Sequence, residues 1–168
     1  MGRPKALVHA DDGTSWLRRA SSLLERSGCQ PVIVVLGARA EEARALLDRE
    51  VVVVARDWQT GLSASLRAGL EAAAETDATA ALITLVDLPN LPLAVADRVL
   101  ERLGVTAEVI GRAVYDGQPG HPVLLGRTHW EQVCASITAD DGARDYLRSA
   151  GAVLVECGDL GGGDDIDS

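Results

Sequence analysis

A carboxylate follows a long apolar stretch in the middle of the sequence. Residues 80–86 read AALITLV, Asp87 comes directly afterwards, and Pro89 stands two positions further on. Such an unbroken apolar run predicts a strand covered on both faces, as in a parallel sheet between layers of helices. Ligands of such sheets bind beyond the carboxyl ends of the strands, where a carboxylate can hold Mg²⁺ together with substrate phosphates. Asp87 is therefore a candidate metal ligand; the alternative is that it caps the next helix.

A cation suited to phosphate stands near the start of the sequence. Lys5 follows Gly2, Arg3 and Pro4. A lysine ammonium is a compact point charge, and in this setting it is a candidate phosphate contact. The simpler alternative is a solvated side chain near a chain terminus.

A glycine precedes a predicted helix that begins at about Leu62. Gly61 stands just before this helix, and Ser63 and Ser65 lie in its first turn. The first turn of a helix has N–H groups without intrahelical partners, so such a terminus suits an anion or the polar edge of a base. Ordinary capping by a hydroxyl side chain explains the same residues equally well.

Two segments in the second half carry further polar groups. Gly120 and His121 lie at the turn of a predicted hairpin, where a ligand contact and an ordinary surface histidine are equally good interpretations. Asp141 and Arg144 open a predicted helix; Asp141 suits an N-cap, and Arg144 suits pairing with it or contact with a substrate phosphate. Neither a zinc site nor a Ser–His–Asp arrangement is recognisable from the spacing.

Carboxylates gather again near the last residue. Asp164, Asp165 and Asp167 form either a solvated acidic tail or, if the segment folds back, the second half of a metal site with Asp87. Both interpretations remain open from the residues alone.

Strands and helices alternate along most of the sequence. This pattern predicts a doubly wound α/β fold with a mostly parallel sheet, whose βα loops gather along one edge. The predicted strands are 31–36, 51–55, 80–86 and 152–156, with a hairpin excursion formed by 108–115 and 121–125. The predicted helices are 15–27, 40–47, 62–74, 92–103, 130–137 and 142–149.

The composition limits the class of protein. A length of 168 residues predicts one domain, and the net charge of −9 argues against nucleic acid or an anionic membrane surface as partner. The three cysteines show no metal-ligand spacing, which is typical of reduced thiols in the cytoplasm. No apolar run approaches the length of a membrane span, and no secretory signal is present.

Six short motifs, taken together and in this order, resemble one family. They are MGRPKAL at 1–7, GLSASL at 61–66, LVDLP at 85–89, GHPVLL at 120–125, DGAR at 141–144 and DID at 165–167. The sequence resembles the MobA-like nucleotidyltransferases, most closely the branch of molybdenum-cofactor cytidylyltransferases. The resemblance implies a Rossmann-like fold of the nucleotide-diphospho-sugar transferase type. It also implies transfer of CMP from CTP to a molybdopterin-type cofactor, with Mg²⁺ as cofactor and release of pyrophosphate.

The resemblance also assigns roles to residues. It implies that Lys5 and Asp87 are catalytic, with Asp87, Asp165 and Asp167 holding the metal. The implied nucleotide-binding residues are Gly2, Arg3, Lys5, Gly61, Leu62, Ser63 and Ser65. The residues implied to face the acceptor are Gly120, His121, Asp141 and Arg144.

The resemblance fails at the start of the sequence. Family members carry a strand and a Gly-rich phosphate loop before the segment equivalent to residues 1–5, and here both are absent. We therefore expect residues 1–168 to be a single domain truncated at the N-terminus, through a late start, and also at the C-terminus. Two other functions stay open: an NAD(P)H-dependent oxidoreductase of the same family, although no Gly-x-Gly-x-x-Gly is present, and a non-enzymatic protein that delivers cofactor to a molybdoenzyme.

Overall fold

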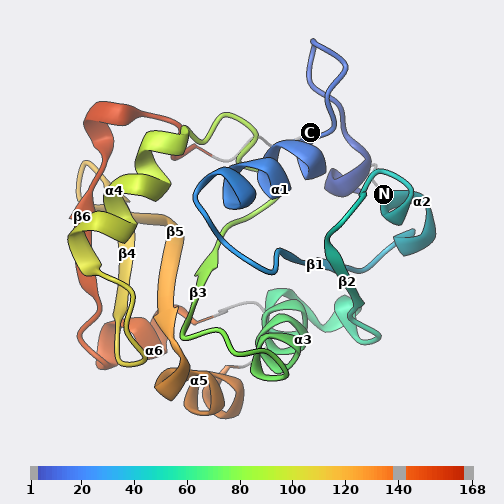
Figure 1. Cartoon of the computed structure of the whole chain (residues 1–168). Helices are drawn as coiled ribbons and strands as arrows, with labels where there is room; N and C mark the ends of the chain where they lie inside the picture. The colour runs from blue at the N-terminus through green and yellow to red at the C-terminus, as the bar shows by residue number, and fades with distance from the viewer. Residues whose placement is uncertain (1–3, 138–142, 165–168) are drawn as a thin grey trace.

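The computed structural model describes residues 4–137 and 143–164 (Figure 1). Five residues with predicted roles lie outside the described residues: Gly2, Arg3, Asp141, Asp165 and Asp167. That residues 1–168 form one truncated domain stays a prediction.

Helices and strands alternate as the sequence predicts. The strands are β1 (Ile33–Leu36), β2 (Val51–Val54), β3 (Ala80–Ile83), β4 (Ile110–Tyr115), β5 (Gln118–Gly126) and β6 (Val153–Glu156). The α-helices are α1 (Trp16–Arg26), α2 (Ala40–Arg44), α3 (Leu62–Ala74), α4 (Leu93–Leu103), α5 (Trp130–Ser136) and α6 (Arg144–Ser149). Short 3₁₀ turns are η1 (Lys5–Leu7), η2 (Trp58–Thr60), η3 (Arg127–His129) and η5 (Gly158–Leu160).

The strands form two sheets. In the four-stranded sheet, with the order β3-β5-β4-β6, β5 is antiparallel to β3 and β4, and β6 is parallel to β4. Three of its strands therefore run in one direction, and the parallel pair β1-β2 forms the second sheet. The predicted α/β fold with mostly parallel strands is confirmed.

One part of the fold prediction is corrected. We expected strands 32–36, 51–55 and 81–86 to share one sheet, but β1 pairs with β2 and β3 pairs with β5. The two sheets meet through side chains instead of ladder hydrogen bonds, since Ile33 of β1 packs in the same apolar cluster as Ile83 of β3.

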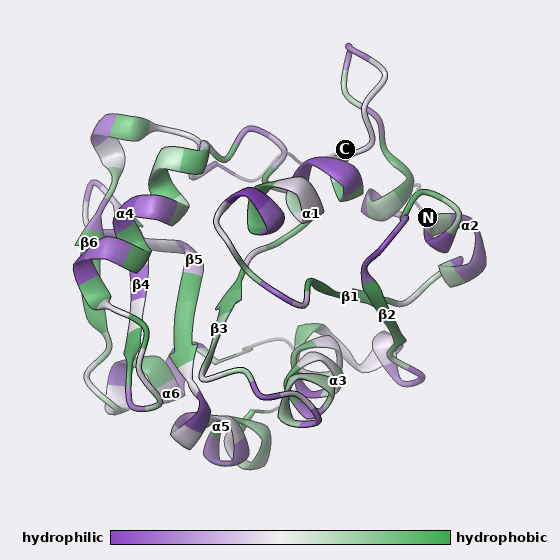
Figure 2. Cartoon of the chain, viewed as in Figure 1, coloured by the Kyte–Doolittle hydropathy of each residue, from purple (hydrophilic) through white to green (hydrophobic). Residues whose placement is uncertain are grey.

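Helices cover both faces of the four-stranded sheet (Figure 1). Leu124 of β5 packs in a core with residues of α1 and α4, whereas its neighbours Val123 and Leu125 pack in a core with α3, α5 and α6. This alternation follows from the two-residue period of a strand. The strands of this sheet are accordingly hydrophobic along much of their length (Figure 2).

The apolar stretch 80–86 is less buried than expected. Its side chains face both cores as predicted, but β3 hydrogen-bonds to a neighbour on one side only, and every residue of the stretch is partly exposed. The deeply buried strand is β5, which lies between β3 and β4.

The predicted hairpin is present, but its turn is tighter than expected, so Gly120 and His121, which we expected at the turn, lie inside β5. Asp116 and Gly117 have φ angles of 50° and 77°, and Tyr115 pairs directly with Gln118. Two central residues with positive φ match the twist of the flanking strands, which is why Asp-Gly suits this position. Glu156 at the end of β6 accepts the N–H groups of Asp116 and Gly117 at 3.0 and 3.2 Å and so anchors the turn.

In the described part of the chain, no helix combines the length and the hydrophobicity that crossing a membrane requires.

Candidate active site

The structure joins two predicted site residues that stand far apart in the sequence. Lys5 lies in η1, and Asp87 lies in the turn that follows β3. The Nζ atom of Lys5 donates to Oδ2 of Asp87 at 3.0 Å. The two side chains keep 31% and 21% of their exposure, so a ligand can reach the pair.

The second oxygen of Asp87 is positioned for a further ligand. Oδ1 is buried and has no hydrogen-bond partner among the residues that the structure describes. An unpartnered buried carboxylate oxygen is costly, and such a group calls for an explanation. Mg²⁺ is commonly held by one or two carboxylates together with substrate phosphates, so a single carboxylate with one open oxygen fits this ion. The described residues contain no cluster of three or more metal-ligating side chains.

The C-terminal segment passes close to the loop that follows Asp87. Gly162 has a φ angle of 80°, and a Cβ atom there would lie 2.7 Å from the carbonyl oxygen of Asn90 and 2.4 Å from Cδ of Pro92. Only a glycine permits both the conformation and the close approach. The segment that leads to Asp165 and Asp167 therefore lies against the loop that follows Asp87.

His121 is electrostatically connected to Asp87. Burial, together with the positive charge of Arg112, lowers the pKa of His121 to about 4, while the charge of Asp87 opposes both effects. The hydroxyl of Tyr115 donates to the carbonyl oxygen of His121 at 2.7 Å. His121 is therefore neutral at pH 7 and held by its own backbone at this position.

Arg112 is a site residue that we did not predict. Its Nε and Nη2 atoms donate to the carbonyl oxygen of Gly120 at 3.0 and 2.7 Å. Burial lowers the pKa of Arg112, and the positive charge of Arg144 lowers it as well. The sequence offers only a weak signal that Arg112 is a site residue, namely a charged residue inside the apolar strand Ile110–Tyr115.

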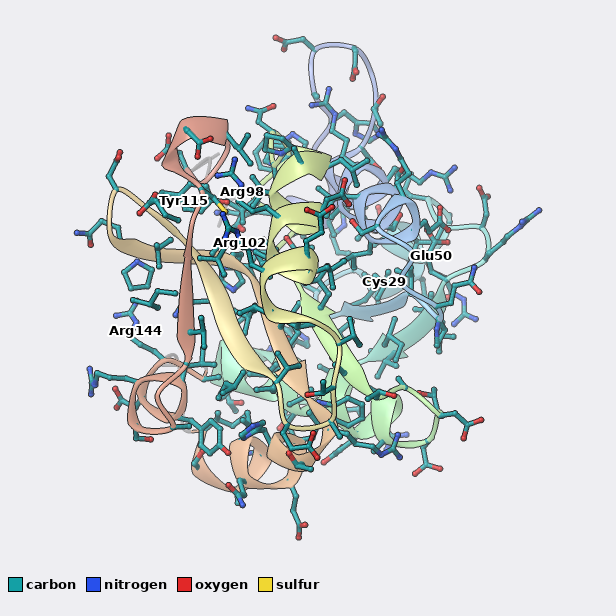
Figure 3. The ribbon with its side chains drawn as sticks, turned by 60° about the vertical axis from the view of Figure 1, so that its left-hand side comes forward. Cys29, Glu50, Arg98, Arg102, Tyr115 and Arg144 are labelled. Atoms are coloured by element: carbon teal, nitrogen blue, oxygen red, sulfur yellow. The ribbon has the colours of Figure 1, made fainter. Side chains whose placement is uncertain are left out.

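Arg144 begins α6 and is exposed. Figure 3 shows Arg144 on the same side of the ribbon as Tyr115 of the hairpin. That Arg144 faces the acceptor together with Gly120 and His121 stays a prediction.

The Gly61 segment is built as predicted. Gly61 has a φ angle of 110° and directly precedes α3, in which Ser63 is buried, Ser65 is half-buried and Leu62 is exposed. Helix α3 contacts β1, β2 and η2, whereas Asp87 follows the four-stranded sheet. That Gly61 and Asp87 open onto one crevice stays a prediction.

Comparisons with known proteins identify the family of the chain. A family model described as a MobA-like NTP transferase domain matches residues 1–153. The nicotine blue oxidoreductase of Paenarthrobacter nicotinovorans is 33% identical over 180 residues, which cover 100% of this chain and 86% of that protein.

Solved structures share the fold. The manganese complex of Rv0371C from Mycobacterium tuberculosis H37Rv is 29% identical with a TM-score of 0.73, over 93% of this chain and 82% of that chain. A nucleotidyl transferase from Methanothermobacter has a TM-score of 0.75 at 21% identity, over 91% of this chain and 74% of that chain, which is a likeness of fold alone.

The family model covers most of the chain, and the paired Lys5 and Asp87 stand inside the matched region. The chain therefore belongs to the MobA-like NTP transferase family and is an enzyme of the nucleotidyltransferase type, with a nucleoside triphosphate as substrate.

Proposed function

We propose that this protein transfers CMP from CTP to a phosphate of a molybdopterin-type cofactor and releases pyrophosphate. The observation that carries the proposal is the Lys5–Asp87 pair, in which Asp87 keeps one buried, unpartnered oxygen. The carboxylate suits a metal ion, and the ammonium group suits phosphate oxygens. The pair therefore suits a substrate whose phosphates bind together with a metal ion.

The roles of the residues follow from their chemistry. Asp87 would hold Mg²⁺ together with Asp165 and Asp167, and the bound ion would supply positive charge beside the phosphates. Lys5 stabilises the charge that grows on the leaving pyrophosphate. The residues that bind the nucleotide are Gly2, Arg3, Lys5, Gly61, Leu62, Ser63 and Ser65. The residues that face the acceptor are Gly120, His121, Asp141 and Arg144.

In this nucleotidyl transfer the enzyme mainly positions the reacting groups and does not need to remove a proton from the acceptor. An oxygen of the acceptor phosphate forms a bond to the α-phosphorus of CTP, and the bond from that phosphorus to the α–β bridging oxygen breaks. The electron pair of the broken bond leaves with pyrophosphate. An acceptor phosphate is already ionised near neutral pH, so no general base is needed. This agrees with a pKa of about 4 for His121, which leaves a neutral imidazole to act by hydrogen bonding.

The start of α3 supports the choice of a pyrimidine. Ser63 is buried in the first turn of this helix, directly after the Gly61 turn. Backbone N–H groups and a hydroxyl at such a terminus can pair with the polar edge of cytosine. A base that leaves these buried groups unpaired binds less well, so CTP is preferred over GTP and ATP.

A second candidate function is supported by the relative named nicotine blue oxidoreductase, which matches the whole of this chain. In that case NAD(P)H would replace the nucleoside triphosphate, and the acceptor would be a small heterocycle. The sequence carries no Gly-x-Gly-x-x-Gly motif, which favours the transferase.

The test measures pyrophosphate release by residues 1–168 with molybdopterin-type cofactor, Mg²⁺ and each of CTP, GTP and ATP. We expect release to be fastest with CTP and to depend on Mg²⁺. The variant Asp87→Asn should lower it at least about hundredfold, because the metal-holding charge is lost. The control Asp77→Asn changes an exposed carboxylate after α3 and should leave the rate unchanged.

Two results would contradict the proposal. Equal release from CTP and GTP would refute the nucleotide preference. Oxidation of NADH or NADPH by a heterocyclic acceptor, without pyrophosphate release from any triphosphate, would establish the oxidoreductase instead.

A further inference from the structure

One of the three tryptophans lies at the surface. Trp16 and Trp130 keep 6% and 4% of their exposure, whereas Trp58 keeps 40%. Among the exposed large hydrophobic side chains in the part of the chain that the structure describes, it alone is aromatic. A single exposed apolar side chain is normal, so the exposure by itself has no functional meaning. The position of Trp58 in the fold gives it one.

Trp58 lies at the edge of a sheet where a ligand is expected. β1 and β2 are parallel, and Leu36 pairs with Val54, so both strands end at the same edge. Trp58 begins η2, in the segment that leads from this end of β2 to α3 (Figure 1). Ligands of α/β sheets bind beyond the carboxyl ends of parallel strands. The exposed indole is therefore at the ligand-binding edge of the β1-β2 pair.

The side chain of Trp58 is held in place on one side. A Cβ atom at Gly37, the residue directly after β1, would lie 2.8 Å from both Cβ and Cγ of Trp58. The lack of a side chain at Gly37 thus lets the tryptophan lie on the backbone. The N–H group of Trp58 donates to Ala55 at 3.3 Å, and its carbonyl oxygen accepts from Gly61 at 3.2 Å. An aromatic ring fixed in this way loses little freedom when a ligand stacks on it.

The end of β1 and the carboxylate of the candidate site belong to the same apolar cluster. Leu36, which directly precedes Gly37, is buried in this cluster, and Val86, which directly precedes Asp87, packs against it. The strand end that carries the tryptophan and the strand end that carries the carboxylate thus rest on common side chains. This arrangement suits one ligand with an aromatic ring at one end and phosphates at the other.

We propose that Trp58 is the stacking platform for the nucleobase of the nucleoside triphosphate. A flat heteroaromatic ring stacks on an indole through dispersion and the burial of apolar surface. Such stacking tolerates every base, so Trp58 supplies affinity for the base and leaves the choice between bases to hydrogen bonds.

A pterin ring of the acceptor has the same stacking chemistry. The nucleobase is favoured because the N–H group of Gly61, which directly precedes α3, donates to the carbonyl oxygen of Trp58. The assignment to the nucleobase rests on the proposed function, which puts the Gly61 turn at the base.

The experiment compares CTP with inorganic tripolyphosphate, each with Mg²⁺, on the full chain, with dissociation constants measured by calorimetry. Tripolyphosphate offers the phosphates without a base. We expect Trp58→Leu, which keeps an apolar side chain over Gly37, to weaken CTP binding about tenfold, the effect of losing one stacked base. The same variant should bind tripolyphosphate as wild type does. Trp58→Phe keeps a ring and should restore most of the affinity for CTP.

The control variant is Leu154→Ala, which removes a 59% exposed apolar side chain from β6 of the other sheet. It should change neither affinity. The platform is refuted if wild type binds CTP no better than tripolyphosphate, if Trp58→Leu leaves CTP binding unchanged, or if it weakens both ligands equally.

The tryptophan fluorescence of wild type decides the question if Trp58→Leu does not fold. CTP should quench the emission and tripolyphosphate should not, because Trp16 and Trp130 are buried and only Trp58 is open to a base. Equal emission with both ligands would refute the platform.

A titration with neopterin, a pterin without phosphate, distinguishes the two rings. If Trp58→Leu weakens neopterin binding but leaves CTP binding unchanged, the indole serves the acceptor and the assignment to the nucleobase is overturned. Failure of the proposed function gives a different result. If no pyrophosphate is released with molybdopterin-type cofactor, but Trp58→Leu still loses CTP and keeps tripolyphosphate, the transfer is rejected and the stacking platform stands.

Discussion

Mild acid should destabilise the fold through His121. Burial, reinforced by the charge of Arg112, lowers the pKa of this imidazole to about 4 in the folded chain, against an ordinary value of 6.5. At pH 7.5 the group is neutral in both states and contributes no pH dependence. As the pH falls through 6.5, the unfolded chain binds a proton that the folded chain refuses until about pH 4. Stability therefore falls between these two values.

The size of the effect follows from the difference in pKa. One pKa unit corresponds to about 1.4 kcal/mol, so the full loss is about 3 kcal/mol and about 2 kcal/mol is already lost at pH 5. A domain of this size has a total stability of only about 5–15 kcal/mol, so the loss is readily measurable.

The assay compares urea unfolding at pH 7.5 and pH 5.0 for wild type and His121→Gln. Glutamine keeps the backbone carbonyl that Tyr115 holds but does not titrate. Carboxylates titrate in both proteins, so their contribution cancels in the difference. We expect the free energy of unfolding of wild type to fall by about 2 kcal/mol more than that of the variant.

A direct measurement of the pKa of the His121 imidazole completes the test. The His121 imidazole, followed by NMR, should titrate near pH 4. If it titrates near its ordinary value, or if wild type and His121→Gln lose the same stability, then the burial and the neighbouring Arg112 charge do not act as described.

The remaining predictions concern the C-terminal segment. Gly162→Ala should lower the melting temperature more than Gly161→Ala: both glycines have positive φ angles, but only a Cβ atom at position 162 meets Asn90 and Pro92, so equal losses would show that this segment does not lie against the loop. Glu156→Gln should lower the melting temperature at pH 7, because backbone N–H groups, that of Gly158 first, lower the pKa of this carboxyl and favour its charged form. The gap between wild type and this variant should close as the pH falls through the lowered pKa, and a gap independent of pH would contradict the role of the charge.

The sequence predicts the elements well because their signals are local. Helix α3 begins at Leu62 and ends at Ala74 as predicted, since Gly61 precedes it and apolar residues recur with helical spacing. Lys5 and Asp87, which pair in the structure, could each be predicted as a site residue. Asp87 follows a predicted strand, and Lys5 is a cation directly after Gly2, Arg3 and Pro4.

The pairing of the strands depends on contacts that no local pattern contains. The stretch 80–86 is the more apolar run, yet β5 is the better buried strand because β3 and β4 lie on either side of it. Arg112 escaped prediction for the same reason. Its importance comes from Gly120, and only the folded chain brings this residue to it.

A chain with a net charge of −9 repels a polyanion such as a nucleoside triphosphate. The Lys5–Asp87 pair indicates how this repulsion is overcome at the site. Two opposite charges 3.0 Å apart present little net charge to a phosphate. Lys5 can turn its ammonium group to a phosphate once another cation neutralises Asp87, whose Oδ1 atom is already placed for one. If Asp87 holds the metal and Lys5 the phosphates, as we propose, then metal and triphosphate assist each other at this pair, and neither is expected to bind well alone.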